Sequence, residues 1–289
     1  MSENRTLLGT VLRNPVGLAA IAWLVIASLA MMLAPWLTLH DPLEQDLLGV
    51  LTKPSAAHLF GTDALGRDIF SRVLHGGRST LVAAAEALAV YLAAGVTLGL
   101  MAGYLGGWVD WAASRLAELL IAMPTIIIVL VVLAVFPGNM DMAMGCIGFI
   151  ASAGLIRILR AQAMAYREEL YVAAAAVAGL TRGQIMLRHI APRVMSTIIV
   201  QGSLLLAAAV SAQAGLGFLG FGAPPPEPSW GGLIHDASQV ISRAPWMLVS
   251  TGAPLILTVL ALGLLGDVIR DAAVQGWSVP KLARTAQLR

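Results

Sequence analysis

The sequence is poor in charged residues, aromatic residues and cysteine. Charged side chains make up 12% of the 289 residues and aromatic side chains 6%, whereas a typical soluble domain is roughly 25% charged. This shortage of charge excludes an ordinary soluble domain, and no basic stripe outside the loops supports nucleic-acid binding. The lone cysteine, Cys146, excludes an intramolecular disulfide.

The usual patterns of catalytic, nucleotide-binding and metal sites are also missing. No G-x-x-x-x-G-K-S/T loop occurs, and no nucleophile, base or metal constellation indicates a membrane-embedded enzyme. The five histidines show no two-histidine helical spacing. Met140, Met142, Met144 and Cys146 offer soft donors, but alternate residues point around a helix and do not converge. We therefore expect no catalytic site, metal site or cofactor on this chain.

Long apolar runs, in contrast, are abundant. Apolar residues make up 58% of the chain, and the mean hydropathy is +0.82. Because an apolar run of about 20 residues crosses the hydrocarbon core as a helix, we predict an all-α integral membrane protein. The six expected transmembrane helices lie at residues 16–37, 81–105, 116–136, 141–158, 194–217 and 243–267. They divide the chain into an N-terminal segment (1–80), a five-helix core (81–270) and a C-terminal tail (271–289).

The distribution of basic residues predicts the orientation. An even number of spans places both termini on one side of the membrane, and lysine and arginine are enriched on the cytoplasmic side. On the side opposite the termini lie only Lys53, Arg67, Arg72, Arg78 and Arg243, out of 18 basic residues. Both termini and the long loop at about 160–193 are therefore predicted to be cytoplasmic.

The segment HLFGTDALGRDIFSRVLHGGRSTL, residues 58–81, is the first feature of the outer side. Its apolar and polar residues alternate at helical spacing after a glycine-rich start. The apolar face holds Ile69, Phe70, Val73 and Leu74, and the polar face holds Arg67, Asp68, Ser71 and Arg72. This pattern predicts a short interfacial helix along the membrane surface.

The loop GFLGFGAPPPEPSWGGLIHDASQVI, residues 217–241, is the second outer feature. Its triple proline cannot continue a helix, and a short helix is expected from about residue 232 to 241. Trp230, His235 and Asp236 are its candidate functional residues. Composition alone leaves two interpretations open, a cap over the outer mouth of a pathway or a stiff connector.

The cytoplasmic loop REELYVAAAAVAGLTRGQIMLRHIAPR, residues 167–193, predicts a helix, a tight turn and a second helix. Gly179 can supply a left-handed C-terminal cap, and Thr181 with Gln184 forms a capping-box pattern. The second helix is expected to end before Pro192. Four alanines at 173–176 make a low-relief face for a partner's groove, although a plain surface helix fits the composition as well.

YVAAAAVAG followed by RHIAP resembles the cytoplasmic EAA signature of ATP-binding-cassette importer permeases. In the dipeptide, oligopeptide and nickel branch the signature reads approximately E-Y/F-V-E-A-A-R-x-x-G, then R-H-x-L-P. The matching residues are Tyr171, Val172, Ala174, Ala175, Gly179, Arg188, His189 and Pro192. The signature glutamate falls on Ala173, the arginine on Ala176 and the leucine on Ala191, and Glu169 lies one position from the usual acid before the tyrosine.

Further motifs extend this resemblance over nearly the whole chain. FGTDALGRDIFSRVLHGGRSTL at 60–81 is similar to the branch's F/L-G-T-D-x-x-G-R-D-x-x-S-R pattern. AGYLGGWVDWAASRLAELLIAMP at 102–124, FLGFGAPPPEPSWGGLIHDA at 218–237 and GDVIRD at 266–271 also resemble the branch, in the expected order.

The resemblance implies a type I importer permease fold with a cytoplasmic coupling helix near residues 169–180. The implied ATPase-coupling residues are Glu169, Tyr171, Val172, Ala173, Ala174, Ala175, Gly179, Leu180, Arg188 and Pro192. The implied partners are a second homologous permease chain, two cytoplasmic ATPase subunits that carry ATP and Mg, an extracytoplasmic solute-binding protein and the lipid of the bacterial inner membrane. The implied function is ATP-driven import of short peptides, with nickel, a metal chelate, glutathione or another small solute as alternative cargo.

Five residues are candidates for the pathway or a gate. They are Glu86, Pro124, Gly202, Ser203 and Ser211. An acid inside a span is costly to bury, so Glu86 could line the pathway, reach the headgroups or pair with a neighbouring helix. Close helix packing is the alternative role of the small residues. A proton-coupled secondary transporter would use more intramembrane ionisable groups and internal repeats, and the sequence shows neither.

Overall fold

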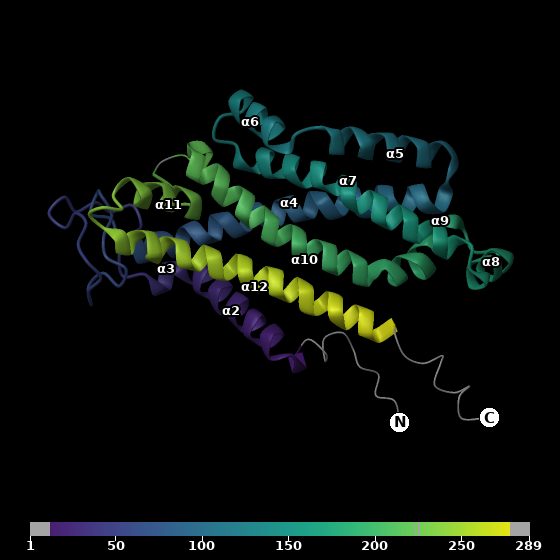
Figure 1. Ribbon diagram of the computed structural model, residues 1–289, viewed down its shortest axis with the longest axis horizontal. Coiled ribbons are helices and arrows are strands. Elements are labelled where there is room, and N and C mark those ends of the chain that lie inside the picture. Colours follow the sequence, from purple (N-terminus) through teal and green to yellow (C-terminus); the bar gives the residue numbers. More distant parts are fainter. Residues whose placement is uncertain (1–11, 223, 225, 278–289) are drawn as a thin grey trace.

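The computed structural model describes residues 12–222, 224 and 226–277, and five long helices dominate this range (Figure 1). They are α2 (Pro15–Met32), α4 (Ile69–Leu105), α7 (Met140–Arg167), α10 (Ala191–Leu216) and α12 (Pro245–Trp277). Each belongs to a helical segment long and apolar enough to cross a membrane. No β-strand occurs among the described residues. The all-α class is confirmed.

The third expected span is a bent pair of helices. α5 (Gly107–Ala122) and α6 (Thr125–Val135) meet at an angle of 84°. Met123, at the break, has an extended backbone with ψ 130°, because the ring of Pro124 excludes the preceding residue from the helical region. The third expected span, 116–136, is thus broken next to Pro124, and six spans result when the pair counts as one.

The expected interfacial helix is also wrong. Residues 69–80 form the first turns of α4, which continues without a break to Leu105 and crosses the division expected at residue 80. At 37 residues, α4 is roughly 55 Å long and exceeds the roughly 30 Å hydrocarbon core. Its expected solvent face is buried as well, with Ser71 0% and Arg72 4% exposed. Tertiary contacts with the outer loops replace water around these polar groups.

The loop at 167–193 folds largely as its sequence predicts. α8 (Leu170–Val177) is followed by α9 (Arg182–Ile185), a π-helical segment η1 (Met186–Ile190) and α10. The helix expected to end before Pro192 instead runs through it into the fifth span. A wider π turn directly before a proline relieves the clash of its ring with the preceding carbonyls.

The C-terminal tail begins later than expected. α12 extends to Trp277, so residues 271–277 still belong to the last helix. Residues 278–289 of the expected tail and residues 1–11 of the expected N-terminal segment lie outside the described range.

Glycines bring α4 and α7 into direct backbone contact. A Cβ added to Gly95 would lie 2.6 Å from Leu155 Cδ2, and one added to Gly148 would lie 3.0 Å from Ala87 Cα and closer still to its carbonyl oxygen. Buried alanines of both helices share this interface. Close approach through small residues is the main source of helix association inside a bilayer, where apolar burial gives little driving force.

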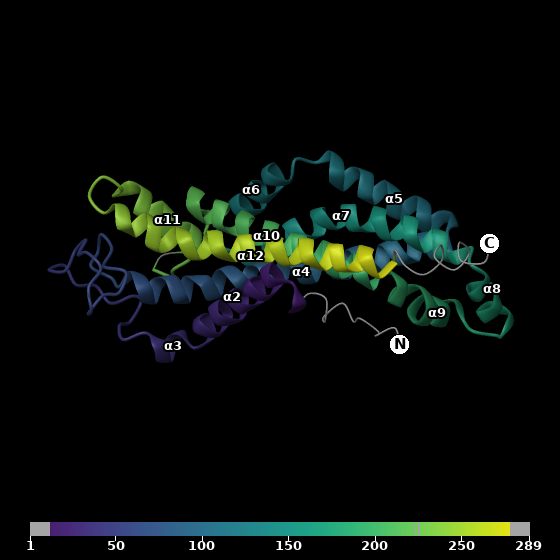
Figure 2. The same ribbon diagram turned by 60° about the horizontal axis from the view of Figure 1, so that its bottom comes forward.

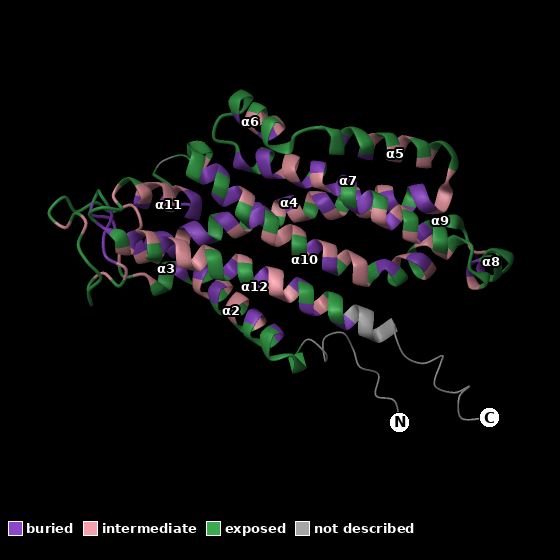
Figure 3. Cartoon of the chain, viewed as in Figure 1, coloured by how far each residue is buried: buried purple, intermediate pink, exposed green. Residues whose placement is uncertain are grey.

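The bundle has two ends, and we call the end that holds the loop 38–68 the outer end, after the orientation that the basic residues predict. α8 and α9 lie at one end, and the loop 38–68 and α11 (Trp230–Gln239) lie at the other (Figures 1 and 2). The start of α2 and the end of the drawn α12 point towards the α8 end. Exposed residues dominate α6 and much of α5 (Figure 3).

Replacing Gly148 with alanine tests the α4–α7 contact. The new methyl group would collide with the backbone of Ala87, so G148A should lower stability by about 1–3 kcal/mol and reduce the yield of folded protein. Gly154→Ala is the matched control, because nothing lies within 4 Å of its added Cβ. Thermal unfolding of both variants in detergent measures the difference, and equal midpoints would refute the contact.

Candidate functional site

α8 is a short helix with well-formed ends. Glu169 occupies its N-cap position without a side-chain hydrogen bond. At the other end, Leu180 N–H donates to Ala175 O at 3.2 Å and Gly179 N–H donates to Ala176 O at 3.1 Å, which is the Schellman arrangement. Gly179 has φ +85°, so the predicted left-handed turn is confirmed.

The helix after this turn starts with the predicted capping box. Thr181 Oγ1 accepts from Gln184 N–H at 3.3 Å, and Gln184 Oε1 accepts from Thr181 N–H at 2.9 Å. The two short helices are thus joined by a turn whose geometry is defined locally. Their relative orientation is held by Val172 and Ala175 of α8, which pack on the buried Ile185 of α9.

The opposite face of α8 is apolar and exposed. It consists of Leu170, Ala173, Ala174 and Val177 at positions i, i+3, i+4 and i+7. Leu170 is 87% exposed and Val177 is 90% exposed. We call these four residues the coupling stripe, after the coupling role that the sequence resemblance implies for this helix. An exposed apolar stripe at the polar end of a membrane protein indicates a partner that covers it.

An aromatic and cationic contact joins α8 to the base of α10. The guanidinium carbon of Arg193 lies 5.2 Å from the centre of the Tyr171 ring, and His189 of η1 stacks on the same ring at 6.5 Å. A cation over an aromatic face contributes roughly 0.5–1 kcal/mol, or more where water is excluded. A side-chain contact as well as the backbone therefore connects α8 to a spanning helix.

The remaining predicted coupling residues lie around this contact. Leu180 packs beside Val172 and Ile185. Arg188 is exposed in η1, and Pro192 is exposed in the first turn of α10. The structure thus brings all of these residues to one end of the bundle.

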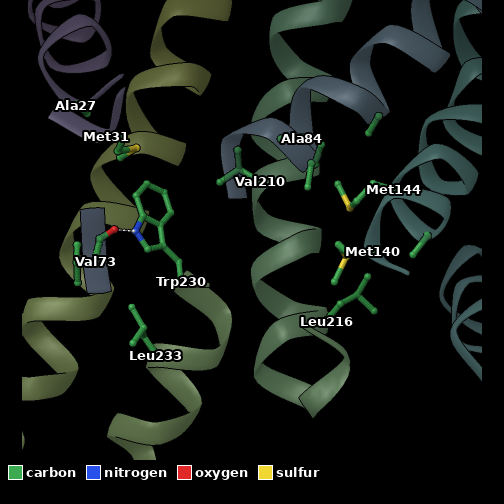
Figure 4. Packing of buried hydrophobic residues seen from close by; sticks show 14 of the residues in the cluster. Ala27, Met31, Val73, Ala84, Met140, Met144, Val210, Leu216, Trp230 and Leu233 are labelled. Atoms are coloured by element: carbon green, nitrogen blue, oxygen red, sulfur yellow. Dashed lines mark hydrogen bonds between the residues drawn. The ribbon is translucent and has the colours of Figure 1, made fainter. Parts of the chain in front are cut away.

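The outer end is organised around Trp230. This side chain is fully buried, and its Nε1–H donates to the carbonyl oxygen of Val73 in α4 at 2.9 Å (Figure 4). Met31 of α2 and Leu233 of α11 lie around the indole ring (Figure 4). Gly77 leaves room for the indole, since an added Cβ would lie 2.8 Å from its Cζ2. Trp230 therefore fastens the outer loop to α4.

Buried charges hold the preceding loop against the same helix. Arg67 Nε donates to Asp63 Oδ2 at 2.7 Å, and Arg72 Nε lies 3.6 Å from the same carboxylate. His58 Nδ1 lies 3.0 Å from Asp68 Oδ1. Removing one member of such a buried network leaves an uncompensated charge, which is costly.

The predicted outer residues His235 and Asp236 lie at the edge of this network. Arg67 approaches Asp236 at 3.9 Å, and His235 Nδ1 lies 2.8 Å from Phe218 O, so this ring nitrogen carries the proton. Partial burial raises the pKa of Asp236, while the guanidinium groups of Arg72 and Arg67 act in the opposite direction. Trp230, His235 and Asp236 thus belong to one outer unit.

The five pathway candidates do not form one cluster. Gly202 faces Leu88 and Leu92 of α4, where an added Cβ would make ordinary contacts of 3.5 and 3.8 Å. Ser203 lies against Gly266 of α12, and its hydroxyl is 3.0 Å from Ile199 O. These two positions contribute to helix packing.

Ser211 and Pro124 are exposed, whereas Glu86 is partly buried. Ser211 is exposed and lines an apolar groove between α10, α11 and α12. Pro124 is exposed at the break between α5 and α6. Glu86 lies beside Asp141 at the start of α7, and its Oε2 is buried without a hydrogen-bond partner among the described residues.

Comparison with known proteins identifies the family. Residues 95–279 match the family described as the binding-protein-dependent transport system inner membrane component. The dipeptide transport system permease protein DppC of Alkalihalophilus pseudofirmus is 37% identical over 88% of this chain and 84% of its own length. The probable D,D-dipeptide transport system permease protein DdpC of Escherichia coli is 34% identical over 89% and 87%. The glutathione transport system permease protein GsiD of Pectobacterium atrosepticum is 36% identical over 76% and 73%.

The chain belongs to this family of permeases. It is a multi-pass inner-membrane permease subunit, and the resemblance seen in the EAA-like loop is confirmed. The coupling stripe and the outer unit are therefore the two ends of a transport component.

Sequence reasoning missed several residues that organise the permease. Arg193 and His189 contact Tyr171, although neither was assigned a coupling role. Leu170 and Val177 complete the coupling stripe and could have been found from their helical spacing around the alanines. Asp141 could not have been paired with Glu86, because they are on different helices.

Replacing Trp230 with phenylalanine tests the outer anchor. The W230F variant keeps an aromatic ring but loses the hydrogen bond to Val73 O, so the permease should lose about 1–2 kcal/mol of stability. Trp108→Phe is the control, because Trp108 is 78% exposed. Thermal unfolding of the purified chain measures both effects, and an unchanged midpoint for W230F would exclude Trp230 as an anchor.

Proposed function

We propose that this permease forms half of the pathway of an ATP-driven importer for short peptides. The observation that carries the coupling role is the coupling stripe, an exposed apolar helix face at the end opposite the outer unit. The stripe binds in a cleft on a cytoplasmic ATPase subunit. ATP and Mg bind to two such subunits, and this chain carries no catalytic residue.

Docking at the stripe relies mainly on shape. Alanines at 173 and 174 present only methyl groups, and Leu170 and Val177 add larger apolar anchors at either end. Glu169 is exposed next to the stripe and supplies a carboxylate at its edge. Burying these side chains in a groove contributes roughly 25 cal/mol per Å² of apolar surface removed from water.

Movement of the ATPase subunits is transmitted to the membrane through α9, η1 and α10. The Schellman turn at Gly179 fixes α8 relative to α9, and the Tyr171–Arg193 contact fixes it to the base of the fifth span. The π-helical segment η1 lies in the middle of this connection, and such segments are frequent at functional sites. A shift of α8 then tilts α10 against α4 and α12 and changes access to the pathway.

A second, homologous permease chain supplies the other half of the wall. Large apolar residues of α6 are exposed, including Ile126 at 67% and Val135 at 63%. Lipid or the second chain covers this face. Both termini lie on the cytoplasmic side, in keeping with the basic residues near α8. An extracytoplasmic solute-binding protein delivers the cargo to the outer unit.

Short peptides are the cargo that the relatives support. Their names refer to dipeptides, D,D-dipeptides and glutathione, all of which carry peptide bonds. Pathway residues are proposed to include Ser211, which is exposed, and Glu86, whose buried Oε2 lacks a partner among the described residues, with Pro124 at a hinge between α5 and α6. Gly202 and Ser203 take part in packing against neighbouring helices.

Uptake in a strain that lacks the gene tests this function. We expect loss of labelled di- and tripeptide uptake, and recovery when the gene is restored. Radioactive nickel offered in parallel is the comparison. Loss of nickel uptake alone would show that the cargo is nickel and leave the proposed importer role unchanged. Unchanged uptake of both would contradict the proposal.

Replacing Gly179 with valine tests the coupling turn. A β-branched residue at φ +85° is strained by roughly 1–3 kcal/mol, so G179V should misplace the coupling stripe. We expect weaker copurification of the ATPase subunits and several-fold lower uptake per ATP hydrolysed. Gly183→Ala is the control, because Gly183 lies in helix α9 with open space around it. Normal coupling in G179V would remove the turn from the mechanism.

A further inference from the structure

A cavity of about 790 Å³, lined by both polar and apolar residues, lies at the outer end of the permease. Its walls come from the outer turns of α4, the start of α7, α10 and three loop residues, Pro224, Glu227 and Pro228. This volume falls in the range of roughly 300–1,000 Å³ typical of small-molecule sites. Ser79 Oγ lies 3.1 Å from Pro228 O, so the loop wall is held against α4 beside the Trp230 anchor.

Gln213 is an unpartnered polar group in the wall of this cavity. Its side chain is only 2% exposed, and its Oε1 has no hydrogen-bond partner among the described residues. A buried amide without a partner costs roughly 1–3 kcal/mol. A native protein keeps such a group where a ligand or water satisfies it. Gln213 comes from α10, the helix that continues from the coupling loop.

Charges of both signs lie in the same walls on different elements. Arg78 of α4 contributes a guanidinium, and no ion pair engages it within the described part of the chain. Asp141 of α7 and Glu227 of the loop contribute carboxylates. His75 Nδ1 donates to Ser71 O at 2.9 Å, which leaves its Nε2 as an acceptor when the ring is neutral.

We propose that this cavity is a transient solute site that selects for a molecule with both an ammonium and a carboxylate group. Arg78 binds the carboxylate, Asp141 and Glu227 attract the ammonium, and the amide of Gln213 hydrogen-bonds the polar groups between them. A short peptide with free termini has this chemistry. The inference rests on the proposed function and adds that the permease itself reads the charged ends of its cargo.

The chemistry of the lining separates this solute from other occupants. A lone metal cation would not need Arg78, and an anion would be repelled by the two carboxylates. A zwitterionic lipid headgroup shares the charges, but its binding would not depend on the ends of a peptide. Selectivity between peptides therefore distinguishes the two sources.

The test compares kcat/KM for uptake of three labelled probes by the complete importer in proteoliposomes, with the binding protein held constant. The probes are alanyl-alanine, its C-terminal amide and its N-acetyl derivative. Arg78→Gln should lower kcat/KM for alanyl-alanine about 3- to 10-fold and leave the amide unchanged, because the amide has no carboxylate to lose. Asp141→Asn should lower kcat/KM by a similar factor for alanyl-alanine and its C-terminal amide, which both have a free ammonium group. It should leave kcat/KM for the N-acetyl derivative unchanged. Contributions of the binding protein cancel in these comparisons.

Exposed charges outside the cavity provide matched controls. Glu44→Gln and Arg243→Gln should leave all three values unchanged, since both residues are exposed and absent from the lining. Gln213→Leu keeps the bulk of the side chain and should lower kcat/KM for every probe. Copurified ATPase and its stimulated activity report whether each variant is assembled.

The outcomes separate this inference from the proposed function. A wild-type importer that takes up no dipeptide would overturn the peptide cargo and the site together. Normal dipeptide uptake with no probe-specific change in R78Q and D141N would overturn the site alone. Equal losses for all probes in fully assembled R78Q and D141N would also overturn it, because they would indicate a structural role or a lipid site.

Discussion

The close packing of α4 against α7 is the contact on which the rest of the structure depends. In a bilayer, lipid tails solvate apolar side chains as well as another helix does, so association needs near-perfect surface contact. Gly95 and Gly148, with the alanines around them, supply that contact. α4 then has a rigid support along most of its length and can project beyond the membrane to organise the outer loops.

The two ends of the permease are held together by different kinds of interaction. At the outer end, Trp230 and the Asp63–Arg67–Arg72 network lock loops onto α4 through buried hydrogen bonds and charges. At the other end, an eight-residue helix is held by a small apolar cluster and a cation–aromatic contact. A helix this short is marginal by itself, so its position follows whatever it is packed against. That difference suits a fixed entrance and a movable coupling element.

α10 connects these two ends and contains several of the polar and small residues discussed above. It begins at a π segment next to the coupling loop and passes Gly202 and Ser203, which pack on neighbouring helices. It then presents Gln213 to the outer cavity. One continuous helix therefore contacts both the coupling loop, which would bind the ATPase, and the outer cavity, which would bind the solute. A small tilt of α10 would change both together.

Features of the chain that arise within a few residues could be predicted from the sequence. The apolar runs determined the helical class and the number of spans, because a backbone in lipid must satisfy its own hydrogen bonds. Gly179 and the Thr181–Gln184 box determined the coupling turn, because cap chemistry is local. Contacts between distant segments decided the rest. Only the tertiary structure shows that Arg72 is buried and that Gln213 lines a cavity, because both depend on segments more than 25 residues away in the chain.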